Sequence, residues 1–277
     1  MKQSRKLFCE YGPVAYWLSV QKCRAVRHMQ NAFSSDKFAR TRHNDSLPYS
    51  VKDFATILHR DSLLFDQVSE QNKAHNVQLA LPKFTHIIVN PNEILSFCIL
   101  LGNCSARKGY KPARVLMNNK PAMAIGGGLC QISNMINYLA LHSKMTRVEY
   151  HDHDWADLYP EFGVQVPFGT GTSTFYNYRD LRFKNDTDIV YQFVFFIKDN
   201  HLHGQLLSDK PQNGTWSIYT PEEYFSRDAD NVYRIGRIMR KWVSDDGNHS
   251  HEEEIKSYRA KLLYDAGDLV KSQEILF

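Results

Sequence analysis

Three consecutive glycines, Gly126–Gly128, constrain the fold of this chain more than any other feature. Glycine adopts positive φ at no steric cost and lets the backbone approach other groups closely, so the triplet predicts a tight turn. Directly after it, Ile132, Ile136 and Leu139 recur at helical spacing. The sequence therefore predicts a sharp turn that leads into a buried helix near the middle of the chain.

The composition is compatible with a folded core around that turn. The chain has 277 residues, of which 43% are hydrophobic and 23% are charged, close to the average of globular proteins. These values exclude a disordered chain, a collagen and a coiled coil. No window reaches the ~20 apolar residues of a membrane helix, and the N-terminus lacks the apolar segment of an export signal. We therefore expect a cytoplasmic protein, with peripheral attachment to the inner membrane face as a further option.

The cysteines favour a reducing compartment. Their number is odd and their positions are scattered, which argues against a disulfide framework. The five are Cys9, Cys23, Cys98, Cys104 and Cys130.

Hydrophobic periodicity predicts helices first and strands later. Ser50 and Asp53 resemble a capping box followed by a helix, and a second helix is expected over residues 70–81. Asn185-Asp186 is a candidate hairpin turn, and residues 244–254 are expected to form an acidic loop. Strands are predicted over residues 84–89, 94–101, 114–118, 148–151, 181–183, 189–198, 202–207, 216–219 and 232–243.

Together these segments predict an α+β fold. It would have N-terminal helices, the glycine turn leading into a buried helix, and a mainly antiparallel β C-terminal half. We expect a basic helical extension over residues 1–69, an α+β domain over residues 70–243, and a tail over residues 244–277 that packs on the domain or follows it.

Cys130 is the strongest candidate for chemistry, because it falls in the first turn of the predicted helix. Free N–H groups and the positive end of the helix dipole there would lower the thiol pKa and favour a nucleophilic thiolate. Neighbouring N–H groups could form an oxyanion hole, which suits acyl transfer. The alternative is a structural turn with Cys130 as a small buried hydrophobe.

A thiol nucleophile needs a base, and His151 and His153 are the candidates. Alternate residues of a strand share a face, so both imidazoles would point the same way. The rival reading is a metal site formed by both histidines with Cys130. The pattern recurs at residues 201 and 203 and at residues 249 and 251, which are expected to be exposed loop histidines.

The N-terminal arm is basic. Residues 1–43 contain nine lysines and arginines and two acidic residues. Such an arm could dock on an anionic membrane surface with Tyr16, Trp17 and Leu18 at the interface, although a solvated helical face is the simpler explanation. We expect no nucleic-acid partner.

The glycine motif and its surroundings resemble the VanW family over roughly residues 70–210. Residues 126–134 resemble the family signature, and His151 and His153 match its His-x-His pair. The remaining similarity lies in Gln71–Lys73 with Asn76, Asn90–Glu93, Leu95–Phe97, Lys108–Tyr110 and Asp180–Asn185. One departure is Gly171, which stands where the family commonly has an aspartate.

The resemblance implies a link to glycopeptide resistance and cell-wall chemistry, with L,D-transpeptidase-like acyl transfer on a peptidoglycan stem peptide or its precursor. Cys130 would then be the nucleophile, and His151 or His153 would move protons. No metal ligand or cofactor is assigned. The alternative is a non-catalytic module that binds a wall-precursor peptide or partner proteins. The residues expected to bind substrate or stabilise the oxyanion are Gly126, Gly127, Gly128, Gln131, Ser133 and Asn134.

Overall fold

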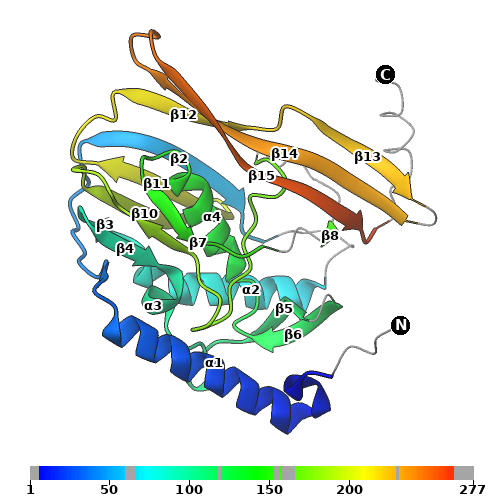
Figure 1. Ribbon diagram of the computed structural model, residues 1–277. Coiled ribbons are helices and arrows are strands. Elements are labelled where there is room, and N and C mark those ends of the chain that lie inside the picture. Colours follow the sequence, from blue (N-terminus) through cyan, green and yellow to red (C-terminus); the bar gives the residue numbers. More distant parts are fainter. Residues whose placement is uncertain are drawn as a thin grey trace.

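The computed structural model describes residues 6–59, 66–117, 120–152, 156–157, 166–228 and 231–264. It confirms the predicted α+β fold with a β-rich C-terminal half (Figure 1). The helices of the described residues are α1 (Pro13–Phe33), α2 (Gln67–Ala80), α3 (Phe97–Leu101) and α4 (Cys130–Ala140), with 3-10 turns η1 (Phe8–Tyr11), η2 (Leu81–Lys83) and η3 (Ala106–Lys108).

Two four-stranded sheets form the body of the molecule. The first has the order β1-β4-β9-β7, made of β1 (Lys37–Phe38), β4 (Glu93–Ser96), β9 (Arg182–Lys184) and β7 (Thr146–Glu149). The second has the order β2-β11-β10-β3, made of β2 (Tyr49–Ile57), β11 (His201–Ser208), β10 (Tyr191–Lys198) and β3 (Ile87–Val89).

Helix α4 packs against the second sheet and fills the core (Figure 1). Its residues Ile132, Met135, Ile136 and Leu139 are buried, as the helical spacing predicts. The contact is close at Gly204 of β11, where an added Cβ would lie 2.4 Å from the Met135 sulfur. A glycine in this strand therefore allows the helix to approach the sheet.

A hairpin leads into the glycine turn. Strands β5 (Pro112–Met117) and β6 (Lys120–Ile125) pair antiparallel, and Gly126 follows β6 directly. Helix α2 lies along this hairpin, because Asn72 donates a hydrogen bond of 2.8 Å to the Pro112 carbonyl. The hairpin and α2 thus position the turn and the start of α4.

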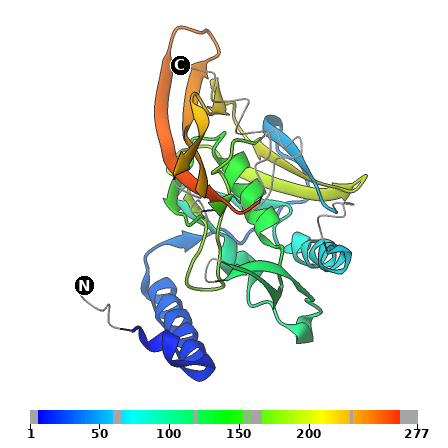
Figure 2. The same ribbon diagram turned by 90° about the vertical axis from the view of Figure 1, so that its right-hand side faces the viewer.

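The C-terminal part forms a third, five-stranded sheet. Strands β12 (Gly214–Tyr219) and β13 (Glu223–Asp228) both pair with β14 (Asn231–Ser244), which pairs with β15 (Ser250–Leu262). Strand β8 (Ala156–Asp157) joins β15 in parallel. The long β14–β15 hairpin stands at one end of the molecule and α1 at the other (Figure 2).

Three predicted elements are wrong. Residues 50–57 form strand β2 rather than a capped helix, although Ser50 does contact Asp53 at 3.0 Å. Pairing with β11 satisfies the backbone of β2, and Lys52, Phe54 and Thr56 alternate with more exposed residues. Tertiary strand pairing outweighs the local capping signal here.

Two more predicted elements are wrong, and a third holds only in part. Asn185-Asp186 is not a hairpin turn, because β9 and β10 belong to different sheets; the Asn185 amide instead bridges the Val89 and Ile189 carbonyls at 2.9 and 2.7 Å. Residues 244–254 are not one loop, because β15 begins at Ser250. The predicted strand 94–101 holds only in its first half, since the Ser96 hydroxyl caps helix α3 by accepting from the Ile99 N–H.

None of the described helices is long and apolar enough to cross a membrane.

Candidate functional site

Each glycine of the turn is required by its surroundings. Gly126 and Gly128 have φ values of +78° and +84°, which L side chains rarely adopt. A Cβ on Gly127 would lie 2.1 Å from the Ala113 carbonyl oxygen, and one on Gly128 would lie 2.1 Å from Cγ of Lys73. The turn is therefore pressed between strand β5 and helix α2.

Hydrogen bonds fasten the turn in this position. The Asn76 amide donates to the Gly127 and Lys111 carbonyls at 3.0 and 2.9 Å, and its oxygen accepts from the Lys111 N–H at 2.8 Å. The N–H groups of Gly126 and Gly127 donate to the Lys111 and Ala124 carbonyls. These two glycines shape the turn, and their N–H groups are used within it.

Cys130 is the first residue of α4 and is exposed. Desolvation nevertheless raises the pKa of its thiol, outweighing the Lys73 ammonium and the N–H groups of Cys130 and Gln131, which lower it. The lowered thiol pKa predicted from the helix position is therefore wrong in its net direction. The N–H groups at the helix N-terminus do lower the thiol pKa, but by less than desolvation raises it.

The charge beside Cys130 comes from α2. Lys73 and Glu70 form an ion pair of 2.5 Å, and their side chains are only 16% and 12% exposed. The Lys73 stem lies over Gly128, which brings its ammonium near the thiol. The sequence assigns neither residue to the site. Its signal for Lys73 is the family-like segment Gln71–Lys73 with Asn76.

Gln131 ties the start of α4 to strand β2. Its amide nitrogen donates to the Thr56 hydroxyl at 2.9 Å and to the Ile57 carbonyl at 2.8 Å. Its amide oxygen is buried and has no partner among the described residues. The side-chain N–H groups of Gln131 are therefore used in holding α4 to β2. Its backbone N–H is the group that lowers the pKa of the Cys130 thiol.

Ser133 and Asn134 hold another segment against α4. The Ser133 hydroxyl lies 2.5 Å from the Thr172 hydroxyl and donates to the Cys130 carbonyl at 3.1 Å. The Asn134 oxygen accepts from the Thr172 N–H and hydroxyl, both at 2.7 Å. Ser133 is fully buried, so these two residues position residues 170–173 beside the first turn of α4.

His151 reaches this region only through the backbone. Its carbonyl accepts from the Ser173 N–H at 2.7 Å, next to Thr172. Its imidazole lies 3.2 Å from a Glu149 oxygen, and Glu149 is held by Arg27 through two bonds of 2.7 Å. Among the described residues, no hydrogen bond or ion pair joins His151 to Cys130. His153 lies outside the described residues.

Gly171, at the position of the family aspartate, has room for a side chain. An added Cβ would meet no atom within 4 Å, and its φ lies outside the left-handed region. Its carbonyl accepts from the Tyr150 hydroxyl at 2.6 Å. The fold therefore does not require glycine here.

The other histidine pairs lie elsewhere. His201 and His203 are on strand β11 rather than in a loop, and the His203 ring stacks on Phe196 at 4.8 Å between centroids. His249 precedes β15 and His251 lies within it. Within the described ranges, no group of three His, Cys, Asp or Glu side chains is arranged to hold a metal ion.

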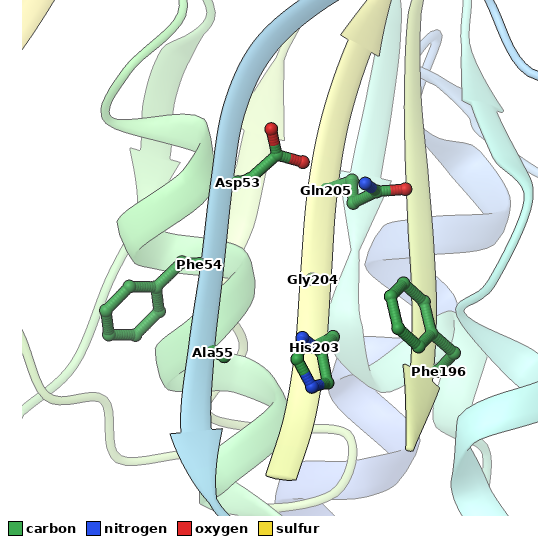
Figure 3. Close-up of a pocket in the computed structure, with 7 residues that line it drawn as sticks. All are labelled: Asp53, Phe54, Ala55, Phe196, His203, Gly204 and Gln205. Atoms are coloured by element: carbon green, nitrogen blue, oxygen red, sulfur yellow. The ribbon is translucent and has the colours of Figure 1, made fainter. Parts of the chain in front are cut away.

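The hollow shown in Figure 3 lies on the second sheet and not at Cys130. It is lined by Asp53, Phe54, Ala55, Phe196, His203, Gly204 and Gln205. Phe54 contacts Tyr138 of α4, so its neighbours Asp53 and Ala55 face the opposite side of the strand. This shallow surface is separated from the thiol by the sheet and is not part of the candidate site.

Comparison with known proteins agrees with this combination of fold and motif. Residues 72–207 match the family model described as VanW like protein. A curated relative, the vancomycin B-type resistance protein VanW of Enterococcus faecalis (strain ATCC 700802 / V583), is 26% identical over 207 residues, covering 75% of each chain. The uncharacterized protein YoaR of Bacillus subtilis (strain 168) is 27% identical over 117 residues, which cover 42% of this chain and 37% of the relative. No solved structure matches.

These matches define a protein with a VanW-like α+β domain. Residues 72–207 are a VanW-family domain, as the motifs predict.

Proposed function

We propose that this protein takes part in vancomycin resistance by cysteine-dependent acyl transfer on a cell-wall stem peptide or its precursor. The main support is the position of Cys130, an exposed residue at the N-terminus of α4 whose thiol lies near the Lys73 ammonium. The name of the Enterococcus relative supports the biological setting. A cytoplasmic location is part of the proposal, supported by five cysteines that are all free.

In the proposed reaction, the Cys130 thiol gives its proton to a base and its sulfur attacks a peptide carbonyl carbon. The carbon–sulfur bond forms and the carbonyl oxygen takes the negative charge. Breaking the carbon–nitrogen bond releases the amine, which receives the proton, and leaves a thioester. A second amine then attacks the thioester and restores the thiol.

The surrounding groups have distinct parts in this scheme. The Lys73 ammonium stabilises the thiolate, and Glu70 holds the lysine in place. No partner for the Gly128 N–H is found among the described residues, which leaves it as a candidate oxyanion donor. The proposed proton carrier is one of the two histidines that the sequence predicts, His151 or His153, and His151 would have to turn its imidazole away from Glu149 to serve. Ser133, Asn134 and Gln131 keep the start of α4 in place.

The test is the release of the terminal D-alanine from a stem tetrapeptide by the purified protein. Cys130→Ala should abolish release, whereas Cys23→Ala, at another exposed cysteine, should retain the wild-type rate. Equal rates for the wild type and Cys130→Ala would overturn the proposed chemistry.

A second candidate is a non-catalytic module that binds the same peptide. The observation in its favour is the raised pKa of the Cys130 thiol, which reduces the thiolate fraction at neutral pH. A carboxylate could then bind at the α4 N-terminus without reaction. In that case Cys130→Ser should keep the peptide affinity measured by calorimetry, and no peptide should be cleaved.

A further inference from the structure

Helix α1 lies along the outside of the molecule and is attached by one face (Figures 1 and 2). Arg27 binds Glu149, the Arg24 carbonyl accepts from Asn177 at 3.1 Å, and Asn31 accepts from Arg182 at 2.7 Å. Residues 24, 27 and 31 share a helix face. None of the 21 residues of α1 is buried, so the helix adds nothing to the core, and polar contacts contribute to its attachment.

The opposite face of α1 is an apolar stripe. We define the outer stripe as Val14, Leu18, Ala25, Met29 and Phe33, which recur at intervals of four or seven residues. Val14, Leu18, Met29 and Phe33 are 72%, 46%, 53% and 88% exposed. A helix normally turns its apolar stripe towards the core, but this stripe points away from it. Such a surface marks an interaction site.

The charge of the arm indicates what covers the outer stripe. Helix α1 contains no Asp or Glu, and Lys22 lies within the face of the stripe, between Met29 and Phe33 in the helical projection. The first 33 residues contain six lysines and arginines against one acidic residue, Glu10. An exposed apolar face that carries a lysine and no acidic residue suits a helix that lies in the interface of an anionic bilayer.

The structure also changes the residues expected at that interface. Leu18 belongs to the outer stripe, whereas Trp17, which is 58% exposed, lies outside it. Tyr16 lies near Tyr178 on the attached side, where it contributes to raising the Tyr178 pKa. Met29 and Phe33 extend the stripe along the helix.

We propose that α1 docks on an anionic membrane surface through its outer stripe. The stripe enters the boundary between headgroups and acyl chains, while the attached face keeps the domain at the membrane. This inference does not depend on the chemistry of Cys130. It would place the domain where lipid-linked substrates are found.

The test is co-sedimentation of the full chain with vesicles. Vesicles of phosphatidylglycerol and phosphatidylcholine should pellet the protein, and pure phosphatidylcholine should not. Leu18→Glu with Met29→Glu should weaken binding by about tenfold or more, because two apolar side chains that the bilayer would bury are replaced by charged ones. Lys22→Gln should weaken it by about fivefold, and added salt should do the same in the wild type.

Tyr224→Glu is the matched control, because it changes a side chain of β13 that is 49% exposed and distant in sequence from α1. It should bind like the wild type. Because the variants change exposed positions, their thermal unfolding should match that of the wild type. Equal binding of wild type and Leu18→Glu/Met29→Glu, or no preference for anionic vesicles, would overturn the proposal. A dimer that this variant converts to monomer, without vesicle binding, would instead assign the stripe to a second copy of the chain.

Discussion

Gly127→Ala should destabilise the protein through one backbone contact. The new Cβ would lie 2.1 Å from the Ala113 carbonyl oxygen, and ordinary contact begins at 3.4 Å. The turn must therefore move away from β5 by about 1.3 Å, a difference taken from those two distances. The carbonyl is part of a paired strand and cannot turn aside as a side chain would.

The movement has two costs. Overpacking at a close contact costs about 1–3 kcal/mol, and strain on the hydrogen bonds from Asn76 to Gly127 and from Gly127 to Ala124 adds about 0.5–1.5 kcal/mol for each bond lost. Alanine also lowers the conformational entropy of the unfolded chain, which raises the free energy of unfolding by about 0.4–1 kcal/mol. The free energy of unfolding should fall by about 2–4 kcal/mol in all.

Urea unfolding followed by circular dichroism measures this change, and Gly171→Ala is the control. A Cβ at Gly171 meets nothing within 4 Å, so that variant should gain about 0.4–1 kcal/mol. If Gly127→Ala unfolds within about 0.5 kcal/mol of the wild type, the close packing of the turn would be refuted.

Three further predictions follow from other contacts. Lys73→Met should raise the pKa of the Cys130 thiol further, because the ammonium lowers it; the pH–rate profile of alkylation by iodoacetamide should move to higher pH, and an unchanged profile would argue against this contact. Burial lowers the pKa of His142 to about 4, so its stabilising contribution is present above the unfolded value of about 6.5 and is lost as pH falls through 4. The free energy of unfolding should drop over that range by about 3 kcal/mol at most, and His142→Gln should flatten the drop in acid unfolding titrations. Gly204→Ala should cost about 1–3 kcal/mol through its contact with Met135, and a smaller cost of the same change in a Met135→Ala background would check the cause.

Local pattern was enough to predict the helices around the site. Helix α4 and helix α2 follow from apolar spacing and stop signals, and the positive φ of Gly126 and Gly128 follows from residue type. Strand β2 could not be predicted in this way, because its backbone is satisfied by β11, about 150 residues away. Strand pairing over that distance leaves no local signal.

The sequence predicts only part of the site, because contacts between distant segments decide the rest. The sequence places Cys130 at the start of a helix, and the structure does so as well. The net direction of its pKa depends on desolvation by the folded chain, which no local motif encodes. Lys73 reaches the thiol only because α2 packs over Gly128. His151 is predicted to act on the thiol, but the folded chain directs its imidazole to Glu149 instead.

The central claim is that Cys130 forms a covalent bond with a cell-wall peptide. Intact-mass spectrometry of the protein mixed with a stem tetrapeptide tests it directly. If Cys130 is the nucleophile, the spectrum should show an added mass equal to the peptide without its terminal D-alanine, mapped to Cys130 and released by hydroxylamine. The adduct should be absent from Cys130→Ala and present in Cys23→Ala. An unmodified mass under conditions in which the peptide binds would contradict covalent catalysis by Cys130 and favour the binding module.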